Sequence, residues 1–247
     1  MEKIKNIRIV GKVVAEILKK LQKEAKVGVS GRDLEKMAEK MMAGNNVHSS
    51  SLGYQGFPAA ICVSLNNQLT HGIPDDRLFQ EGDLVSFDVA CYRKDENGKT
   101  YHADAALTVI VGEGDEKKKD LLKVTRNSLH YAIQSIRPNI TTTQEIGAIL
   151  EKYVRSRGYY PIKEYGGHGI GESLHEEPFI PNYKTPNKGV IIREGMTICI
   201  EPLVQIGDGK ITVSNDKWTV FSPHGYLNAH FEHTVYITSE GAEILTD

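Results

Sequence analysis

Two stretches of the sequence place a single acid among small or apolar residues, where a protein core would be expected. Residues 85–91 alternate, and Asp88 lies on the face with small side chains while apolar residues take the other face. Residues 197–201 alternate in the same way and end on Glu201. Taken alone, such an acid more often faces solvent. If it is buried and unpaired, it protonates, pairs with a cation or binds a metal ion.

Asp104 and Glu232 occupy matching places in two further strand-like stretches and complete a set of four acids. No Arg or Lys within these strands could neutralise them, whereas two divalent cations would. Imidazole ligands are available, because His168 lies between glycines that permit close approach and His175 follows soon after. Oxygen ligands with one or two imidazoles suit a bridged pair of Mn, Fe, Co or Zn ions.

Other motifs in the sequence do not indicate a further functional site. The string HEEP (175–178) is not the helical H-E-x-x-H signature of metalloproteases, and Pro178 opposes a helix there. The string GHGIG (167–171) misses the G-x-G-x-x-G pattern of nucleotide sites. The three cysteines are too few and too scattered for a disulfide framework, so they are expected to be small buried side chains: Cys62, Cys91 and Cys199.

The elements that position these residues follow the same order in both halves of the chain: two helices and then strands. Apolar residues at helical spacing predict four helices, with inner faces within Val10–Leu21, Leu34–Met41, Leu122–Ile136 and Ile146–Tyr153. Leu122 is predicted to lie on the inner face of the third. Ser30 is predicted to cap the second helix, and Thr142 with Glu145 forms a capping box for the fourth. Strong strands are predicted around Leu84–Cys91 and His102–Val111.

The two halves also match in sequence, and in the same order. The matching pairs are SGRDLEKMAEKMM (30–42) with TTQEIGAILEKYV (142–154), THGI (70–73) with GHGI (167–170), EGDLVSFD (81–88) with EGMTICIE (194–201), and HADAALTVIVGEG (102–114) with HFEHTVYITSEG (230–241). Four matches in register indicate an internal duplication about a pseudo-twofold axis. We therefore expect one catalytic domain over residues 1–247, with halves at about 1–115 and 116–247 that share a sheet.

The composition excludes several classes of protein. The chain has 247 residues, of which 40% are hydrophobic and 25% charged, an ordinary globular balance. A net charge of −2 gives no electrostatic footprint for nucleic acid or a membrane surface. The N-terminal stretch lacks the apolar core of a signal peptide, and no apolar run is long enough to span a bilayer. We expect a soluble, cytoplasmic protein.

With these residues in place, the chain resembles the type I methionine aminopeptidases over nearly its whole length. The matching strings are HGIPDD (71–76), EGDLVSFDV (81–89), HAD (102–104), GGHGIGESLHEEP (166–178), GMTICIEPLV (195–204), WTV (218–220) and FEHTV (231–235). The resemblance implies the α+β pita-bread fold, with two pseudo-equivalent αβ halves whose helices cover a curved antiparallel sheet. It implies removal of the initiator methionine from nascent proteins whose second residue is small, by a metal-bridging hydroxide. It also suggests a monomer that meets the ribosome transiently.

The resemblance implies a role for each site residue. Asp88 and Asp104 would bind one metal ion, and Asp104 and Glu232 would bridge it to a second ion. His168 and Glu201 would complete the second site, and Glu201 would also move the proton of the nucleophilic water. Two histidines outside the metal sphere would contact the substrate: His71 and His175. The methionine pocket would be lined by Tyr54, Phe57, Cys62, Leu174 and Trp218.

The chain departs from the family pattern at a few positions. His230 stands where the family commonly has Gln, Leu174 where some relatives have Phe, and Ala105 where Thr or Ser is frequent. None of these changes removes a ligand, so they bear on selectivity and metal affinity.

Three other readings compete with this one. Prolidases share the fold but carry an extra N-terminal domain, and type II methionine aminopeptidases carry a helical insertion that the interval from Glu177 to Glu201 is too short to hold. A catalytically dead binding module on the same fold usually loses ligands, whereas all five are present here.

Overall fold

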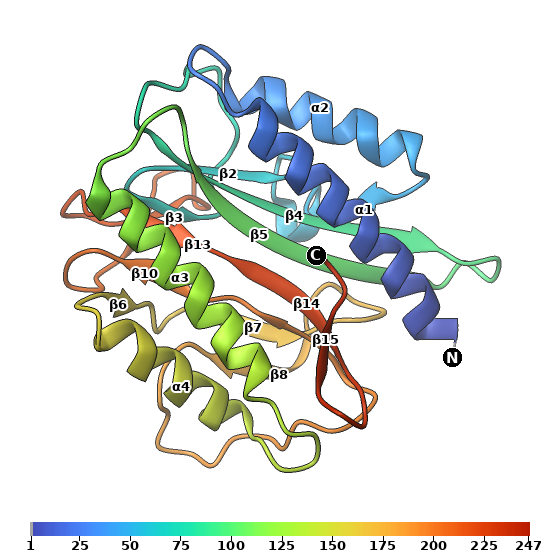
Figure 1. The fold of residues 1–247 in the computed structure, drawn as a ribbon. Helices are drawn as coiled ribbons and strands as arrows, with labels where there is room; N and C mark the ends of the chain where they lie inside the picture. The colour runs from blue at the N-terminus through green and yellow to red at the C-terminus, as the bar shows by residue number, and fades with distance from the viewer. Residues whose placement is uncertain (1) are drawn as a thin grey trace.

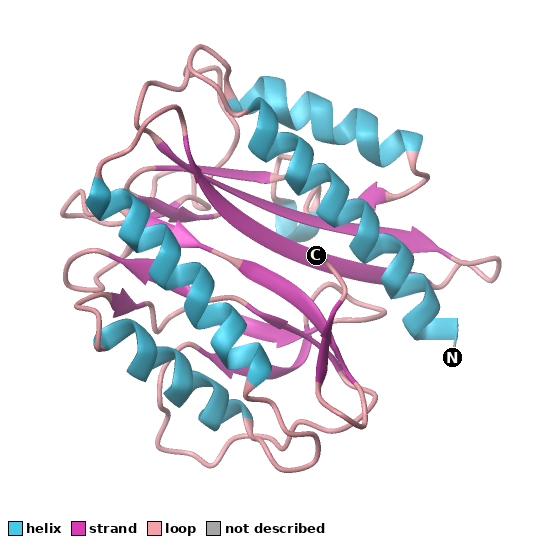
Figure 2. Cartoon of the chain, viewed as in Figure 1, coloured by secondary structure: helices cyan, strands magenta, loops and turns pink. Residues whose placement is uncertain are grey.

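Four helices lie on one side of a curved antiparallel sheet in the computed structural model, which describes residues 2–247 (Figure 1, Figure 2). The helices are α1 (Glu2–Glu24), α2 (Gly31–Gly44), α3 (Glu116–Gln134) and α4 (Thr143–Arg155). Helix α1 packs on the first pair of long strands, and α4 packs on a strand at the other end of the sheet. The arrangement confirms the α+β class predicted from the sequence.

The main sheet brings together the strands that carry the four acids. Its order is β1-β4-β5-β14-β9-β7-β8, with β2 also paired to β4 and β15 to β14. Its strands are β1 (His48–Ser49), β2 (Cys62–Leu65), β4 (Leu84–Lys94), β5 (Thr100–Ile110), β7 (Gly166–Gly169), β8 (Glu176–Pro181), β9 (Thr197–Ile200), β14 (Glu232–Ile237) and β15 (Ala242–Ile244). Strand β14 lies between β5 and β9, so strands from the two halves of the chain meet at the centre of the sheet.

Two small three-stranded sheets and one short helix build the rest of the molecule. One small sheet has the order β13-β10-β6 and the other β11-β12-β3. Their elements are β3 (Gln68–Thr70), β6 (Tyr160–Pro161), β10 (Leu203–Gln205), β11 (Thr212–Val213), β12 (Val220–Phe221) and β13 (Asn228–His230), and the 3₁₀ helix is η1 (Tyr54–Gly56).

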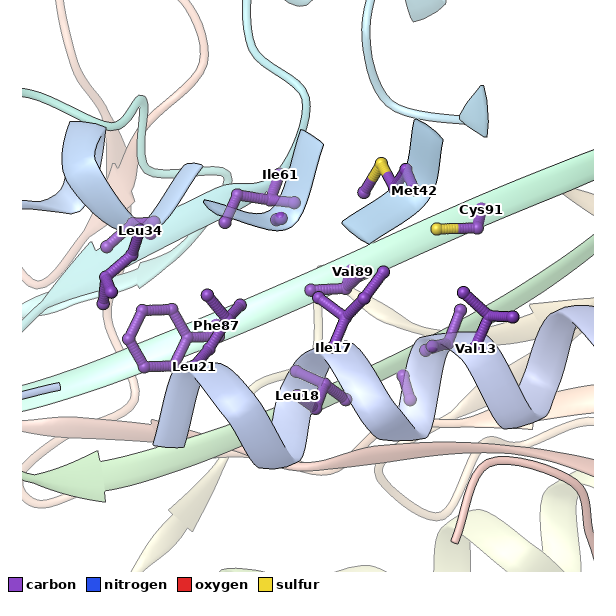
Figure 3. Packing of buried hydrophobic residues seen from close by; sticks show 14 of the residues in the cluster. Val13, Ile17, Leu18, Leu21, Leu34, Met42, Ile61, Phe87, Val89 and Cys91 are labelled. Carbon is purple, nitrogen blue, oxygen red and sulfur yellow. The ribbon is translucent and has the colours of Figure 1, made fainter. Parts of the chain in front are cut away.

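The largest core cluster lies between α1, α2 and the helix-facing side of β4 (Figure 3). Ile17 and Leu21 of α1 pack there with Phe87, Val89 and other residues of the apolar face predicted for that strand. The end of the chain joins this cluster. Gly11 of α1 lies so close to Leu245 that a Cβ on the glycine would meet the Leu245 carbonyl oxygen at 2.4 Å. Only glycine therefore fits at this point of the helix.

The caps of α2 and α4 agree with the sequence. The Ser30 hydroxyl accepts a hydrogen bond from the Asp33 N–H, and the Asp33 carboxylate accepts one from the Ser30 N–H. Thr142 and Glu145 form the same reciprocal pair in front of α4. Each capping box satisfies backbone N–H groups that the first helical turn leaves free.

Helix α3 and the residues just after it bury four of the five residues predicted on its inner face, and the exception is Leu122: the four are Leu129, Ala132, Ile133 and Ile136. Leu121 is fully buried, whereas Leu122 is only partly buried. The buried stripe runs through Thr125 and Ser128, whose hydroxyls donate to backbone carbonyl oxygens within the helix. Because these two residues are polar, the apolar pattern did not show that they belong to the buried stripe. None of the helices among residues 2–247 combines the length and apolar character needed to cross a membrane.

Candidate metal centre

Strand register brings three of the acids together on the face of the sheet away from the helices. Ala106 of β5 pairs with Asp88 on one side and with Glu232 on the other. Asp104 precedes Ala106 by two residues, so its side chain projects from the same face. One oxygen from each of Asp88, Asp104 and Glu232 lies within 4.8 Å of the others. Alternation along the strands therefore turns three distant sequence positions into one cluster.

Glu201 joins this cluster from the next strand. It directly follows β9, whose last residue, Ile200, pairs with His233 of β14. Asn182 donates a hydrogen bond of 2.9 Å from its side-chain amide to the Glu201 carbonyl oxygen, which fixes the chain where the strand ends. The side chain of Glu201 is 14% exposed, so the carboxylate remains accessible from the open side of the site.

Burial opposes the charges that these acids would carry. It raises the pKa of Asp104, Glu201 and Glu232 well above the ordinary carboxyl value, and repulsion between neighbouring acids raises the pKa further. The pKa of Asp88 is also raised by burial, with the nearby His230 acting in the opposite direction. A cation at the centre of the cluster would offset both burial and repulsion.

Orphaned polar atoms show that the site fits a metal ion. Asp104 Oδ1, Glu232 Oε1 and both ring nitrogens of His230 are buried without a hydrogen-bond partner among residues 2–247. Buried polar atoms are nearly always satisfied, by protein groups, water or ions. Carboxylate oxygens with imidazole nitrogens are a donor set that divalent transition metals accept. The residues present therefore suit the metal chemistry predicted from the sequence.

His168 projects into the same site from β7. Its Nδ1 lies 2.9 Å from the carbonyl oxygen of Gly169, to which it donates a hydrogen bond in the tautomer protonated at Nδ1. That tautomer leaves the Nε2 lone pair free, 3.8 Å from Glu201 Oε1. Burial, followed by the neighbouring His175, lowers the pKa of His168 to about 4, which keeps the ring neutral. A neutral imidazole oriented through its second nitrogen is the usual form of a histidine ligand.

His175 and His71 line the cavity over the acids. The Tyr54 hydroxyl lies 2.7 Å from His175 Nδ1, and the rings of His168 and His175 are 4.3 Å apart in a T-shaped arrangement. His71 packs edge-on against Tyr165 at 5.5 Å. Burial lowers the pKa of His71 to about 4, with His230 and His175 adding to the effect.

A cavity of about 580 Å³ opens above the acids and is large enough for a peptide end. Its lining includes every residue that the resemblance assigned to substrate and every expected ligand but Glu232, which lies beneath the floor and is 2% exposed. The apolar wall has two parts. One part contains Phe57, Cys62 and Trp218, and the rings of Phe57 and Trp218 meet edge-on at 5.2 Å. The other part contains Tyr54 and Leu174.

Several residues around the site were not assigned to it from the sequence, although Cys199 and His230 were noted there for other reasons. Cys199 lies within 4.8 Å of donor atoms of His168 and Glu232, and His230 lies within the same distance of Glu201 and Glu232. Both stand two residues before an expected ligand, so strand alternation could have found them. Tyr165 and Phe179 also line the cavity, but only their place in the fold reveals it.

Comparison with known proteins agrees with the geometry. The sequence pattern of metallopeptidase family M24 matches residues 5–239. The chain is 45% identical over 247 residues to a methionine aminopeptidase of Mycoplasma capricolum, covering 99% of this chain and 96% of that protein. It is 37% identical to a methionine aminopeptidase of Escherichia coli K12, covering 99% and 91%.

Solved structures give the same result. The crystal structure of methionine aminopeptidase from Thermotoga maritima superposes with a TM-score of 0.95 at 41% identity, covering 100% of this chain and 97% of that one. Prolidase from Pyrococcus furiosus, at 23% identity, shares the fold with a TM-score of 0.79, and this chain spans 64% of its length. The predicted pita-bread fold is thereby confirmed. With a family match along nearly its whole length and such close relatives, the chain belongs to metallopeptidase family M24, among its methionine aminopeptidases.

Proposed function

We propose that this chain removes the initiator methionine from nascent polypeptides whose second residue is small. Two divalent cations, drawn from Mn, Fe, Co and Zn, would be held by Asp88, Asp104, His168, Glu201 and Glu232. The observation that carries the proposal is the convergence of four acids, from β4, β5, β14 and the end of β9, beneath a cavity with apolar walls. Asp104 and Glu232 are buried, and Asp88 and Glu201 are partly buried. With no Lys or Arg paired to them among residues 2–247, the four carboxylates need cations to remain charged together.

The residues would divide the work as follows. When bound, the cations would polarise the scissile carbonyl and lower the pKa of water. Glu201, which lies at the edge of the cavity, would accept the proton of the attacking water and pass it to the leaving amine. If the Tyr54 hydroxyl donates to His175 Nδ1, the ring proton lies on Nε2, from which it can be donated to the substrate. His71, which also lines the cavity, would provide a second donor.

The pocket supports methionine as the first residue. A long, unbranched and polarizable side chain suits a wall of aromatic rings with a sulfur neighbour, here Phe57, Trp218 and Cys62. A branched Val or Ile would meet this wall with its Cβ substituents. Because a mismatch of this size is worth about 10- to 200-fold, we expect discrimination of that order.

Peptide hydrolysis tests the proposal. We expect metal-dependent release of Met from Met-Ala-x peptides, slow release from Met-Leu-x and little release of Val from Val-Ala-x. Similar rates on the Met and Val peptides would contradict the pocket assignment. Full activity after exhaustive chelation would contradict the metal centre, and no metal binding with no hydrolysis would favour a binding module.

The setting of the reaction belongs to the same proposal. Initiator methionines are accessible as chains leave the ribosome, so we place the protein in the cytoplasm as a monomer with nascent N-termini as its partners. We also propose that the chain is one catalytic domain that arose by internal duplication. The paired capping boxes support this, as do isolated β-bridges from both cap residues, Ser30 to Leu78 and Thr142 to Ile191.

A further inference from the structure

His230 is the least satisfied polar side chain near the metal centre. His230 is 1% exposed, and neither of its ring nitrogens has a hydrogen-bond partner among residues 2–247. The backbone, in contrast, is held on both sides: the His230 N–H donates to Thr108 Oγ1 at 2.8 Å, and that hydroxyl donates to the His230 carbonyl oxygen at 2.9 Å. The ring is therefore positioned by a fixed backbone and buried without a protein partner.

The ring faces two of the expected ligands. His230 Nε2 lies 3.4 Å from Glu201 Oε2 and 4.0 Å from Glu232 Oε2. With metal–donor bonds of about 2.0–2.2 Å, neighbouring donors around one ion lie roughly 3–3.5 Å apart. The same Glu201 carboxylate is 3.8 Å from His168 Nε2 through its other oxygen, Oε1. Glu201 thus lies between two imidazoles.

The matching histidine of the first half has a different environment. His102 stands at the position equivalent to His230 in the sequence repeat. Its Nδ1 lies 2.9 Å from the Ser50 hydroxyl, and its ring lies 5.2 Å from that of Tyr92. His102 has therefore found protein partners, whereas the orphaned nitrogens of His230 call for an ion or water.

We propose that His230 Nε2 is a metal ligand and coordinates the ion that Glu201 and Glu232 share, together with His168. This proposal rests on the metal centre of the proposed function and adds a ligand to it. A second imidazole makes this position richer in nitrogen than carboxylates alone would, which favours Zn, Co or Fe over Mn. The His230 Nδ1–H has no acceptor like the Gly169 carbonyl that orients His168, so His230 would bind the ion less firmly.

Cobalt(II) reports on the number of imidazole ligands directly. The full chain is stripped of metal, given one equivalent of Co(II), and studied by proton NMR for strongly shifted, solvent-exchangeable imidazole N–H resonances. We expect two such resonances in the wild type, one in His230→Gln, and two in the matched control His102→Gln. Calorimetric titration should show a Co(II) dissociation constant raised about tenfold or more in His230→Gln, because even groups that only orient a ligand are worth about 10- to 100-fold.

Each outcome is decisive. Equal numbers of resonances in the wild type and His230→Gln would overturn the His230 assignment and leave the metal centre standing. Absence of Co(II) binding by the wild type would overturn both. If His230→Gln fails to fold, the wild type alone decides: two resonances at one equivalent support the assignment, and a single resonance overturns it.

Discussion

His71 and His168 occupy matching places in the two halves, but only His168 lies on the main sheet. It is part of β7, where the next residue, Gly169, pairs with Ile198 of the acid-bearing strand β9. His71 follows β3, which belongs to a small separate sheet, and it adopts a left-handed φ of 55°. One histidine is thus carried to the acids by a strand, and the other reaches the cavity from a strained turn.

Glycine neighbours do not explain this difference. A Cβ on Gly72 would meet the Val63 carbonyl oxygen at 2.3 Å, much as a Cβ on Gly167 would meet that of Cys199 at 2.1 Å. Both histidines therefore stand beside tightly packed glycines. The two histidines differ in the strand beside which each lies. In a duplicated fold, the neighbouring strand therefore decides whether a repeated residue reaches the metal site.

The largest expected effect is the difference in metal affinity between two single variants, His168→Ala and His71→Ala. His168→Ala should lower metal affinity more than about 100-fold, since even orienting partners of a ligand are worth 10- to 100-fold, and turnover should fall with it. His71→Ala should retain both ions. Metal titration of the purified variants measures the difference. Loss of metal in His71→Ala and its retention in His168→Ala would reverse the comparison between the halves.

A second effect concerns turnover at full metal occupancy. His71→Ala and His175→Ala each remove a hydrogen-bond donor aimed at developing charge, which typically costs about 100- to 1,000-fold in kcat. Rates on Met-Ala-x peptides at saturating metal measure it. Tyr54→Phe is the matched variant, because it keeps the ring and removes only the hydroxyl next to His175. A loss that appears only in KM would show that these histidines merely bind substrate.

A third, smaller effect concerns the stability of the protein at low pH, to which the second half contributes a partly buried histidine. The second half carries His233 where the first carries Ala105. Burial, then repulsion from His130, lowers the pKa of His233 to about 4. The folded state therefore binds fewer protons than the unfolded state between about pH 6.5 and 4, so stability falls as pH drops through this window.

The variant His233→Gln measures this contribution. Relative to the wild type, it should lose less stability between pH 6.5 and 4, by on the order of 1–3 kcal/mol. Denaturant unfolding at a series of pH values measures the difference, with the exposed His48→Gln as control. An identical slope in wild type and His233→Gln would refute the assignment.

The smallest effect is expected at the helix caps. Ser30→Ala and Thr142→Ala should each lower the free energy of unfolding by about 0.5–2 kcal/mol, because each removes the acceptor of a capping box. Ser30 is 2% exposed and Thr142 is only partly buried, so the loss should be greater at Ser30. Urea unfolding of both variants tests the order, and a greater loss at Thr142 would contradict it.

Local patterns predicted more of this molecule than its long-range contacts. Alternation assigned Asp88 and Phe87 to opposite faces of β4, and capping residues located the starts of α2 and α4. The same alternation points to His230 as a neighbour of Glu232, although a short strand in a different sheet hides it. Tyr165 and Phe179 could not be predicted, because the cavity wall depends on how distant segments pack.

The contact between Gly11 and Leu245 has a consequence for how the protein is made. Leu245 also donates its N–H to the Thr234 carbonyl oxygen and belongs to the core cluster of α1. The packing of α1 is therefore complete only after Leu245, far along the chain, has been made. Contacts of such long sequence separation form late, because chain entropy must be lost first. Until Leu245 has been translated, part of the apolar face of α1 stays uncovered, which makes the growing chain a target for chaperones.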